Sequence, residues 1–247
     1  ISIYIYKMTE IYSNDSLKIF QDKNKKTIYK IEFNYPCPAL VRSLTKTHII
    51  EGGSITDDYL TLRFKALSVK SFKDFVEQHV EVRGSRILSI NLAANMLSSL
   101  SAQLSHLISF ESNTIIGYSP ENIIVLNDET FAFLGSELVA EICPVGKEMA
   151  IISCPFNVKD FFVSPEMLKI KELPSYIHYK TSYFSLGCLL LFALTGDDNF
   201  YNEYLKEKKC VKINEYLNQL HFKNTKFYWL LSRCLVEEPE KRSIIFV

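Results

Sequence analysis

Residues 115–137 read IIGYSPENIIVLNDETFAFLGSE, and this stretch decides the fold that we expect. Two apolar, strand-forming runs, Ile123–Leu126 and Thr130–Leu134, stand on either side of the polar triplet 127–129. Strand-forming runs separated by a few turn residues are typical of a β-hairpin. We therefore predict a short hairpin in the middle of the chain.

Helical periodicity dominates the sequence around this hairpin. Residues 89–108 place their apolar side chains on one stripe, with Ser89 as the N-cap. Residues 182–196 are apolar on nearly all sides and end at Gly196, which is typical of a buried helix with a glycine C-cap. With two more helices predicted at 213–220 and 226–235, we expect the second half to be mainly helical.

The first third of the chain has the composition of β-strands instead. β-Branched and aromatic residues gather in five runs separated by polar turns, at 3–8, 16–20, 26–33, 39–50 and 57–67. We predict that these runs form one antiparallel sheet. The interval 31–38 contains Pro36 and Pro38 and is too short for a helix with two connections, so we expect no helix between the third and fourth runs.

Composition excludes several classes of protein. The 247 residues are 47% hydrophobic and 23% charged, and 28 basic residues balance 28 acidic ones, so nucleic acid is not an expected partner. The longest apolar run, 184–194, is shorter than the roughly 20 residues of a membrane span, so no membrane insertion is expected. The six cysteines form no C-x-x-C pair, and we expect free thiols in an intracellular, cytoplasmic compartment.

Four phrases, in order along the chain, resemble motifs of the protein kinase family. YSPENIIVL resembles the segment after the catalytic base, and Ser164-Pro165-Glu166 resembles the A-P-E motif. The helix at 182–196 resembles the D-x-W-S-x-G helix, and CLVEEPEKR resembles the late helix that carries a structural arginine. The resemblance implies a structural ion pair between Glu166 and Arg242.

The fold class that this resemblance implies is α+β, with the bilobal protein-kinase-like architecture. Residues 1–67 would form a small antiparallel β-sheet N-lobe in which the regulatory helix is reduced or absent. Residues 68–247 would form a mainly α-helical C-lobe.

The catalytic loop of this family, H-R-D-L-x-x-x-N, is degenerate here. The histidine position is Ile115, the base position is Gly117 and the phosphate-neutralising lysine position is Ser119. Asn122 is retained. Since glycine offers no proton acceptor, the resemblance implies that the catalytic base is missing.

The nucleotide site is reduced in the same way. Phe133, Leu134 and Gly135 stand at the D-F-G positions, so the carboxylate that holds the metal is missing. Lys30 matches the strand lysine that contacts phosphates, and Ile28 stands where the family has an alanine beneath the adenine. We expect Lys30 and Asn122 to be vestigial nucleotide-binding residues, Ile28 to project into the adenine slot, and neither a metal nor a cofactor to be bound.

These losses predict a catalytically inactive pseudokinase that acts as a protein-interaction or scaffolding module without binding Mg-ATP. Its partner would be another protein, or adjoining domains of a longer chain, since the sequence begins ISIYIYKM without an initiator Met. The candidate interaction surfaces are an edge strand at 1–8 and the apolar segment before Pro165.

Two alternatives stay open. The first is an atypical phosphotransferase in which Glu121, Asp128 or Glu137 replaces the lost acids and points into a cleft beside Lys30 and Asn122. The second is a nucleotide-sensing switch that binds ATP without a metal and without turnover.

Overall fold

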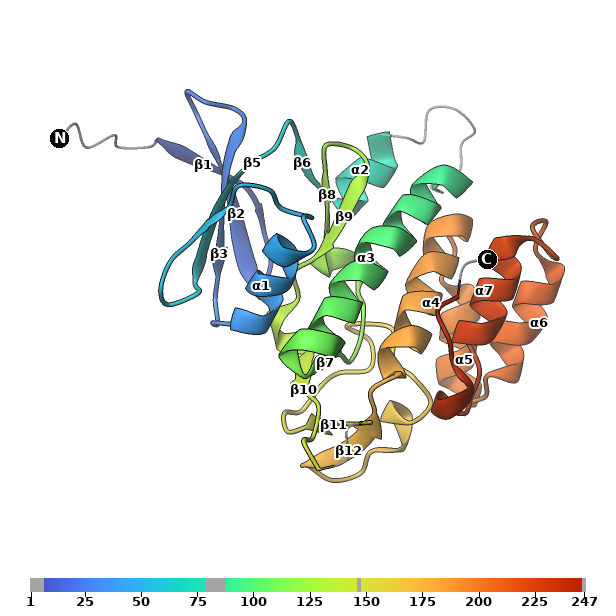
Figure 1. Ribbon diagram of the computed structural model, residues 1–247. Helices are drawn as coiled ribbons and strands as arrows, with labels where there is room; N and C mark the ends of the chain where they lie inside the picture. Colours follow the sequence, from blue (N-terminus) through green and yellow to red (C-terminus); the bar gives the residue numbers. More distant parts are fainter. Residues whose placement is uncertain (1–6, 79–87, 146–147, 246–247) are drawn as a thin grey trace.

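The computed structural model describes residues 7–78, 88–145 and 148–245. Over these residues the chain is a mixed α+β protein with antiparallel sheets and seven α-helices. Figure 1 shows the N-terminal sheet and α1 on one side of the molecule and helices α3 to α7 on the other. Among the described residues, no helix combines the length and the apolar composition of a membrane span.

The N-terminal sheet has five antiparallel strands in the order β1-β2-β3-β5-β4. Their bounds are β1 Met8–Ser13, β2 Leu17–Asp22, β3 Ile28–Phe33, β4 Ser54–Ile55 and β5 Thr61–Lys65. Tyr29, Ile31 and Phe33 alternate with half-exposed residues along β3, as the two-residue period of a strand requires. Ile31 lies opposite Ile19 of β2 and Leu62 of β5, so the buried face is continuous across three strands.

A helix, α1 (Pro38–Lys46), lies between β3 and β4. The strand predicted at 39–50 is therefore wrong, and the helix expected to be reduced or absent in this region is present as a helix of nine residues. Pro38 stands in the first helical turn, where the N–H that proline lacks has no helical partner to lose. Leu40, Ser43 and Leu44 are buried at the spacing of one helical face, so burial of that face decides in favour of a helix.

The predicted hairpin is confirmed. It consists of β8 (Ile123–Leu126) and β9 (Thr130–Phe133), and its turn residues Asn127 and Asp128 adopt positive φ angles of 53° and 61°. The chain enters this region through β6 (Val69–Ser71), which pairs with β8 and not with the N-terminal sheet. Ion pairing of Lys70 with Asp128 at 2.8 Å supports this junction.

Both long predicted helices are confirmed, as α3 (Ile90–Glu111) and α4 (Thr181–Thr195). Ser89 caps α3, because its Oγ accepts a hydrogen bond from the N–H of Leu92. Gly196 ends α4 with a φ of 65°.

The helices predicted at 213–220 and 226–235 are confirmed as α6 and α7, whereas α2 and α5 were not predicted. The bounds of these elements are α2 Phe72–Gln78, α5 Asn199–Glu207, α6 Val211–Gln219 and α7 Lys226–Cys234. The remaining strands are short: β7 Asn113–Ile115, β10 Val139–Glu141, β11 Met149–Ile152 and β12 Ser175–His178. Of the edge strand proposed at 1–8, residues 1–6 lie outside the described residues.

A buried glutamine joins α3 to both α1 and β9. The Nε2 of Gln103 donates to the carbonyl of Phe133 at 2.9 Å and to Ser43 Oγ at 3.2 Å, and its Oε1 accepts from the N–H of Phe133 at 3.0 Å. All three residues are fully buried. Because buried polar groups need hydrogen-bond partners, this amide holds the two elements at fixed positions on α3.

Near the C-terminus, Arg242 forms the ion pair that the sequence implies. Its guanidinium donates to the two carboxylate oxygens of Glu166 at 2.6 and 2.8 Å, and three backbone carbonyls accept its other hydrogen bonds. Arg242 is only 1% exposed. The pair ties residue 166 to the C-terminal segment.

Replacing Gln103 tests the first of these contacts. Gln103→Leu would leave the backbone N–H and carbonyl of Phe133 buried without a partner, so we expect the free energy of unfolding to fall by about 3 kcal/mol. Urea denaturation measures this change. Gln219→Leu, at an exposed helical position, is the control and should change stability by less than about 0.5 kcal/mol. Equal effects would contradict the role of Gln103.

The ion pair of Glu166 with Arg242 can be compared with an exposed ion pair of the same protein, Glu238 with Lys241. Glu166→Ala would leave the Arg242 cation buried without its carboxylate, so we expect a loss of about 3–5 kcal/mol in the free energy of unfolding. Glu238→Ala removes the solvent-exposed pair with Lys241 and should have a much smaller effect on stability. Calorimetric unfolding of both variants compares them, and similar losses would argue against a buried, stabilising pair.

Candidate functional site

The loop 116–122 follows β7 and carries three of the predicted site positions, Gly117, Ser119 and Asn122. Ile115 is the last residue of β7 and is fully buried. The N–H of Tyr118 donates to Ser185 Oγ of α4 at 2.6 Å. Ser119 is also buried, and its Oγ accepts from the N–H of Glu121 at the start of a 3-10 turn. This hydroxyl holds the loop in shape.

An aromatic ring covers Gly117. A Cβ built on Gly117 would lie 1.9 Å from Cδ2 of Phe161, so no other residue fits here without movement of the ring. Two hydrogen bonds to the backbone around Phe161 hold its segment in place. The N–H of Phe162 donates to the carbonyl of Tyr118 at 2.9 Å. The hydroxyl of Tyr201 donates to the carbonyl of Phe161 at 3.0 Å. The ring of Phe161 therefore fills the space beside residue 117.

Asn122 is held by side chains from two other segments. Its Oδ1 accepts from Asn14 Nδ2 at 3.3 Å, and its Nδ2 donates to Glu137 Oε1 at 3.0 Å. Ser16 Oγ donates to the other oxygen of Glu137 at 2.6 Å. The turn between β1 and β2 is therefore bonded directly to the 3-10 turn at 120–122.

Two further contacts strengthen this closure. Tyr12 Oη donates to the carbonyl of Glu121 at 2.7 Å, and Asn14 Nδ2 also reaches that carbonyl at 3.2 Å. Asn14 is itself fixed, because its Oδ1 accepts from the N–H groups of Ser16 and Leu17. These bonds lie between segments more than a hundred residues apart in the sequence.

Phe133, Leu134 and Gly135 are buried beside this network. The ring of Phe133 packs against Tyr118 with centroids 5.1 Å apart, and the N–H of Leu134 donates to the carbonyl of Asn122 at 2.8 Å. A Cβ on Gly135 would lie 2.7 Å from Asn122 Nδ2, so glycine permits the close approach. The three residues support Asn122 and offer no carboxylate.

Lys30 and Ile28 lie elsewhere, away from Asn122. Along β3 they share the half-exposed face with Glu32, opposite to the buried face of Ile31. Lys30 Nζ pairs with Glu32 at 2.5 Å and lies 4.3 Å from the centre of the Phe20 ring. The structure therefore does not bring Lys30 to Asn122, and neither Lys30 nor Ile28 lines either of the cavities at this site.

Of the three acids considered as replacements, only Glu137 is hydrogen-bonded to Asn122. Asp128 pairs with Lys70 at the hairpin turn, and Glu121 meets the network through its backbone carbonyl. The cleft predicted for the alternative phosphotransferase, with an acid beside both Lys30 and Asn122, is not formed in this structure. Within the described ranges, no three His, Cys, Asp or Glu side chains are grouped so that they could hold a metal ion.

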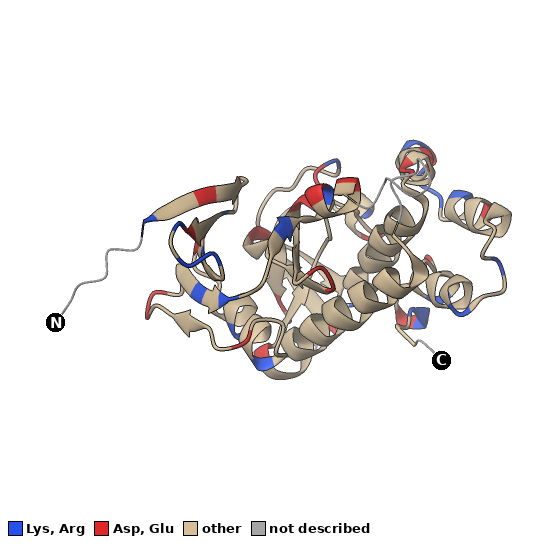
Figure 2. Cartoon of the chain, turned by 90° about the horizontal axis from the view of Figure 1, so that it is seen from above, with Lys and Arg blue, Asp and Glu red and all other residues tan. Residues whose placement is uncertain are grey.

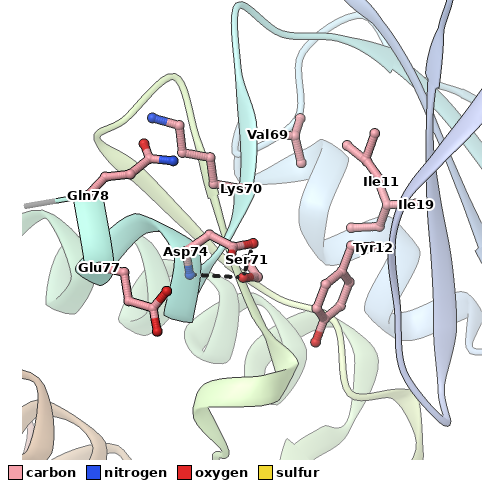
Figure 3. Close-up of a pocket in the computed structure, with 9 residues that line it drawn as sticks. All are labelled: Ile11, Tyr12, Ile19, Val69, Lys70, Ser71, Asp74, Glu77 and Gln78. Atoms are coloured by element: carbon pink, nitrogen blue, oxygen red, sulfur yellow. Dashed lines mark hydrogen bonds between the residues drawn. The ribbon is translucent and has the colours of Figure 1, made fainter.

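A cavity of about 440 Å³ lies between the N-terminal sheet and α2 (Figure 3). Ile11, Tyr12 and Ile19 come from the sheet, and Asp74 and Glu77 come from α2. The volume is in the range of small-ligand pockets. Its charged side chains from α2 are both carboxylates, and β6 adds the cation of Lys70 to the lining.

No protein-family model matches the chain, and no curated protein gives a significant match to it.

Sequence reasoning missed three of the residues that close the site: Asn14, Ser16 and Phe161. A signal for Asn14 was present, because Asn followed two residues later by Ser favours a turn in which the Asn side chain caps backbone N–H groups. Nothing local identifies Phe161 as the neighbour of Gly117, since the two are 44 residues apart in the sequence (161 minus 117).

A double-mutant cycle tests the contact of Phe161 with Gly117. Gly117→Ala is expected to lower the free energy of unfolding by about 1–3 kcal/mol, because the new methyl group overlaps the ring. In the Phe161→Ala background the same change should cost less than about 0.5 kcal/mol. Urea denaturation of the four proteins gives the coupling energy, and equal costs in both backgrounds would contradict the contact.

Proposed function

We propose that the chain is a catalytically inactive, protein-kinase-like domain, a pseudokinase, that works by binding another protein and does not bind Mg-ATP. Residues 1–67 would be its N-lobe and residues 68–247 its C-lobe. The order of elements supports this proposal: a sheet with one helix, a connector near residues 66–69, the helices α2 and α3, a hairpin, and then the helices α4 to α7. The six free thiols support an intracellular, cytoplasmic location.

The observation that carries the proposal is the ring of Phe161 on Gly117. In the protein kinase pattern this is the place of the base that accepts the proton of the substrate hydroxyl. Here glycine has no acceptor, and the ring fills the space that an acidic side chain would need. A positioned base contributes about 10²–10⁴ to a rate, so its absence removes a large part of the catalytic effect.

The surroundings of Asn122 argue against a bound metal–triphosphate. Asn14 and Glu137 already use both ends of its amide, and Ser16 uses the second oxygen of Glu137. A metal held by phosphates also needs carboxylate ligands and cationic neighbours. Lys30 is paired with Glu32 on the half-exposed face of β3, so it supplies no cation beside Asn122.

Nucleotide titration tests this function. A ligand present at 100 times its dissociation constant raises the free energy of unfolding by about 2.7 kcal/mol. We expect no rise in Tm with Mg-ATP or with ATP and EDTA, and no phosphate transfer to a mixture of protein substrates. An active protein kinase in the same assays is the positive control.

The two alternatives give different results in these assays. A rise in Tm with ATP in the presence of EDTA, without turnover, would favour the nucleotide-sensing switch. Phosphate transfer that disappears in Glu137→Gln would favour the atypical phosphotransferase, because Glu137 is the one of the three candidate acids that contacts Asn122. Either result would overturn the proposed function.

A further inference from the structure

A large groove extends from the closed site across the molecule. Its volume is about 2130 Å³, and its walls run from the β1–β2 turn past α2 and the turn at 120–122 to residues 151–162 and α5. Small-molecule pockets measure about 300–1,000 Å³. The groove is therefore too large for a small ligand alone and has the size for an extended segment of polypeptide.

One wall of the groove consists of residues 151–162 and the end of α4, and aromatic side chains make up much of this wall. Phe156, Phe161, Phe162 and Phe192 all line the groove, and the ring of Phe162 packs against Tyr201 with centroids 4.8 Å apart. Phe161 and Phe162 are buried, whereas Phe156 and Phe192 are half-buried and can contact a partner side chain such as the guanidinium of arginine. The apolar segment before Pro165, which the sequence marked as a candidate surface, contributes the first three of these rings.

The charges on the groove are strongly one-sided. Eight carboxylates line it and only two lysines, although the whole chain has 28 basic and 28 acidic residues. Acidic and basic residues are otherwise interspersed over the chain (Figure 2). The eight acids are Asp15, Asp74, Glu77, Glu121, Glu137, Glu141, Asp160 and Asp198.

These carboxylates also lack the ion pairs that several acids elsewhere form. Among the described residues, none of the eight lies within ion-pair distance of a lysine, arginine or histidine, whereas Glu111, Asp128 and Glu166 are each paired. The pKa of Tyr12 is raised, first by burial and further by the carboxylates of Glu121 and Asp74. Among the described residues that line it, the groove therefore presents an excess of negative charge to a ligand.

We propose that this groove binds a basic, arginine- or lysine-rich peptide segment of a partner protein. Cations of the peptide would pair with the carboxylates, and arginine in particular forms two parallel hydrogen bonds to a carboxylate and stacks on aromatic rings. The inference rests on the proposed function as an interaction module and specifies the chemistry of its partner.

Fluorescence polarisation with labelled nona-arginine tests the inference. We expect saturable binding that weakens as salt rises from about 0.05 M to about 0.5 M, and no binding of labelled nona-glutamate. The groove variant carries Glu77→Gln, Glu121→Gln and Glu141→Gln, three acids whose side chains take no part in the closure around Asn122. It should bind nona-arginine about tenfold more weakly, since each accessible charge pair contributes modestly.

A matched variant separates the groove from overall charge. Glu51→Gln, Glu129→Gln and Glu172→Gln remove three exposed acids outside the groove and change the net charge equally. Its dissociation constant should stay within about twofold of the unmodified protein. Equal weakening in both variants, or no saturable binding to the unmodified protein, would overturn the assignment.

Three outcomes distinguish this inference from other interpretations. A dimer that forms with rising concentration and is lost in the groove variant would assign the groove to a second copy of the chain and overturn the proposal of a separate partner. Failure of nona-arginine to bind leaves the proposed function standing, because that function is tested by nucleotide titration. Phosphate transfer would overturn the proposed function whatever the peptide result.

Discussion

The side-chain amide of Gln103 is the contact on which the centre of the molecule depends. It bonds both backbone groups of Phe133 and the hydroxyl of Ser43, so α3 determines where β9 and α1 lie. β9 leads directly to Gly135, whose missing side chain lets Asn122 approach. A polar group in an apolar interior is costly unless every donor and acceptor is paired, and this requirement gives the arrangement its precision.

Two kinds of interaction close the loop at 116–122 from different sides. On one side an aromatic ring, Phe161, lies on the backbone of Gly117. On the other side, hydrogen bonds from Asn14 and Ser16 connect the β1–β2 turn to Asn122 and Glu137. Opening the loop to a ligand would mean both removing buried apolar contacts and exchanging several hydrogen bonds.

Charge is used differently in the interior and in the groove. The cation of Arg242 is buried and fully hydrogen-bonded, and the breaking of its pair with Glu166 would be costly because the charge could not reach water. Within the part of the chain that the structure describes, the carboxylates of the groove form no ion pair, and they are exposed to solvent. Such accessible charges add little to stability and instead influence which partners associate.

The sequence by itself determined the elements whose causes are local. The hairpin around residues 127–129, the cap at Ser89 and the glycine end of α4 follow from turn chemistry and capping, which act within a few residues. The contact of Glu166 with Arg242 followed from the resemblance and was not derivable from spacing. The alternation along β3 also indicates that Lys30 faces away from the core, because the apolar residues Tyr29, Ile31 and Phe33 face it.

Only the tertiary structure decided the rest. Residues 39–50 contain β-branched residues and were assigned to a strand, but burial of one face of α1 outweighs their weak local preference. The ring of Phe161 on Gly117 and the unpaired acids of the groove arise between segments distant in the chain. Such contacts depend on how separate elements pack, and no pattern within one element specifies that packing.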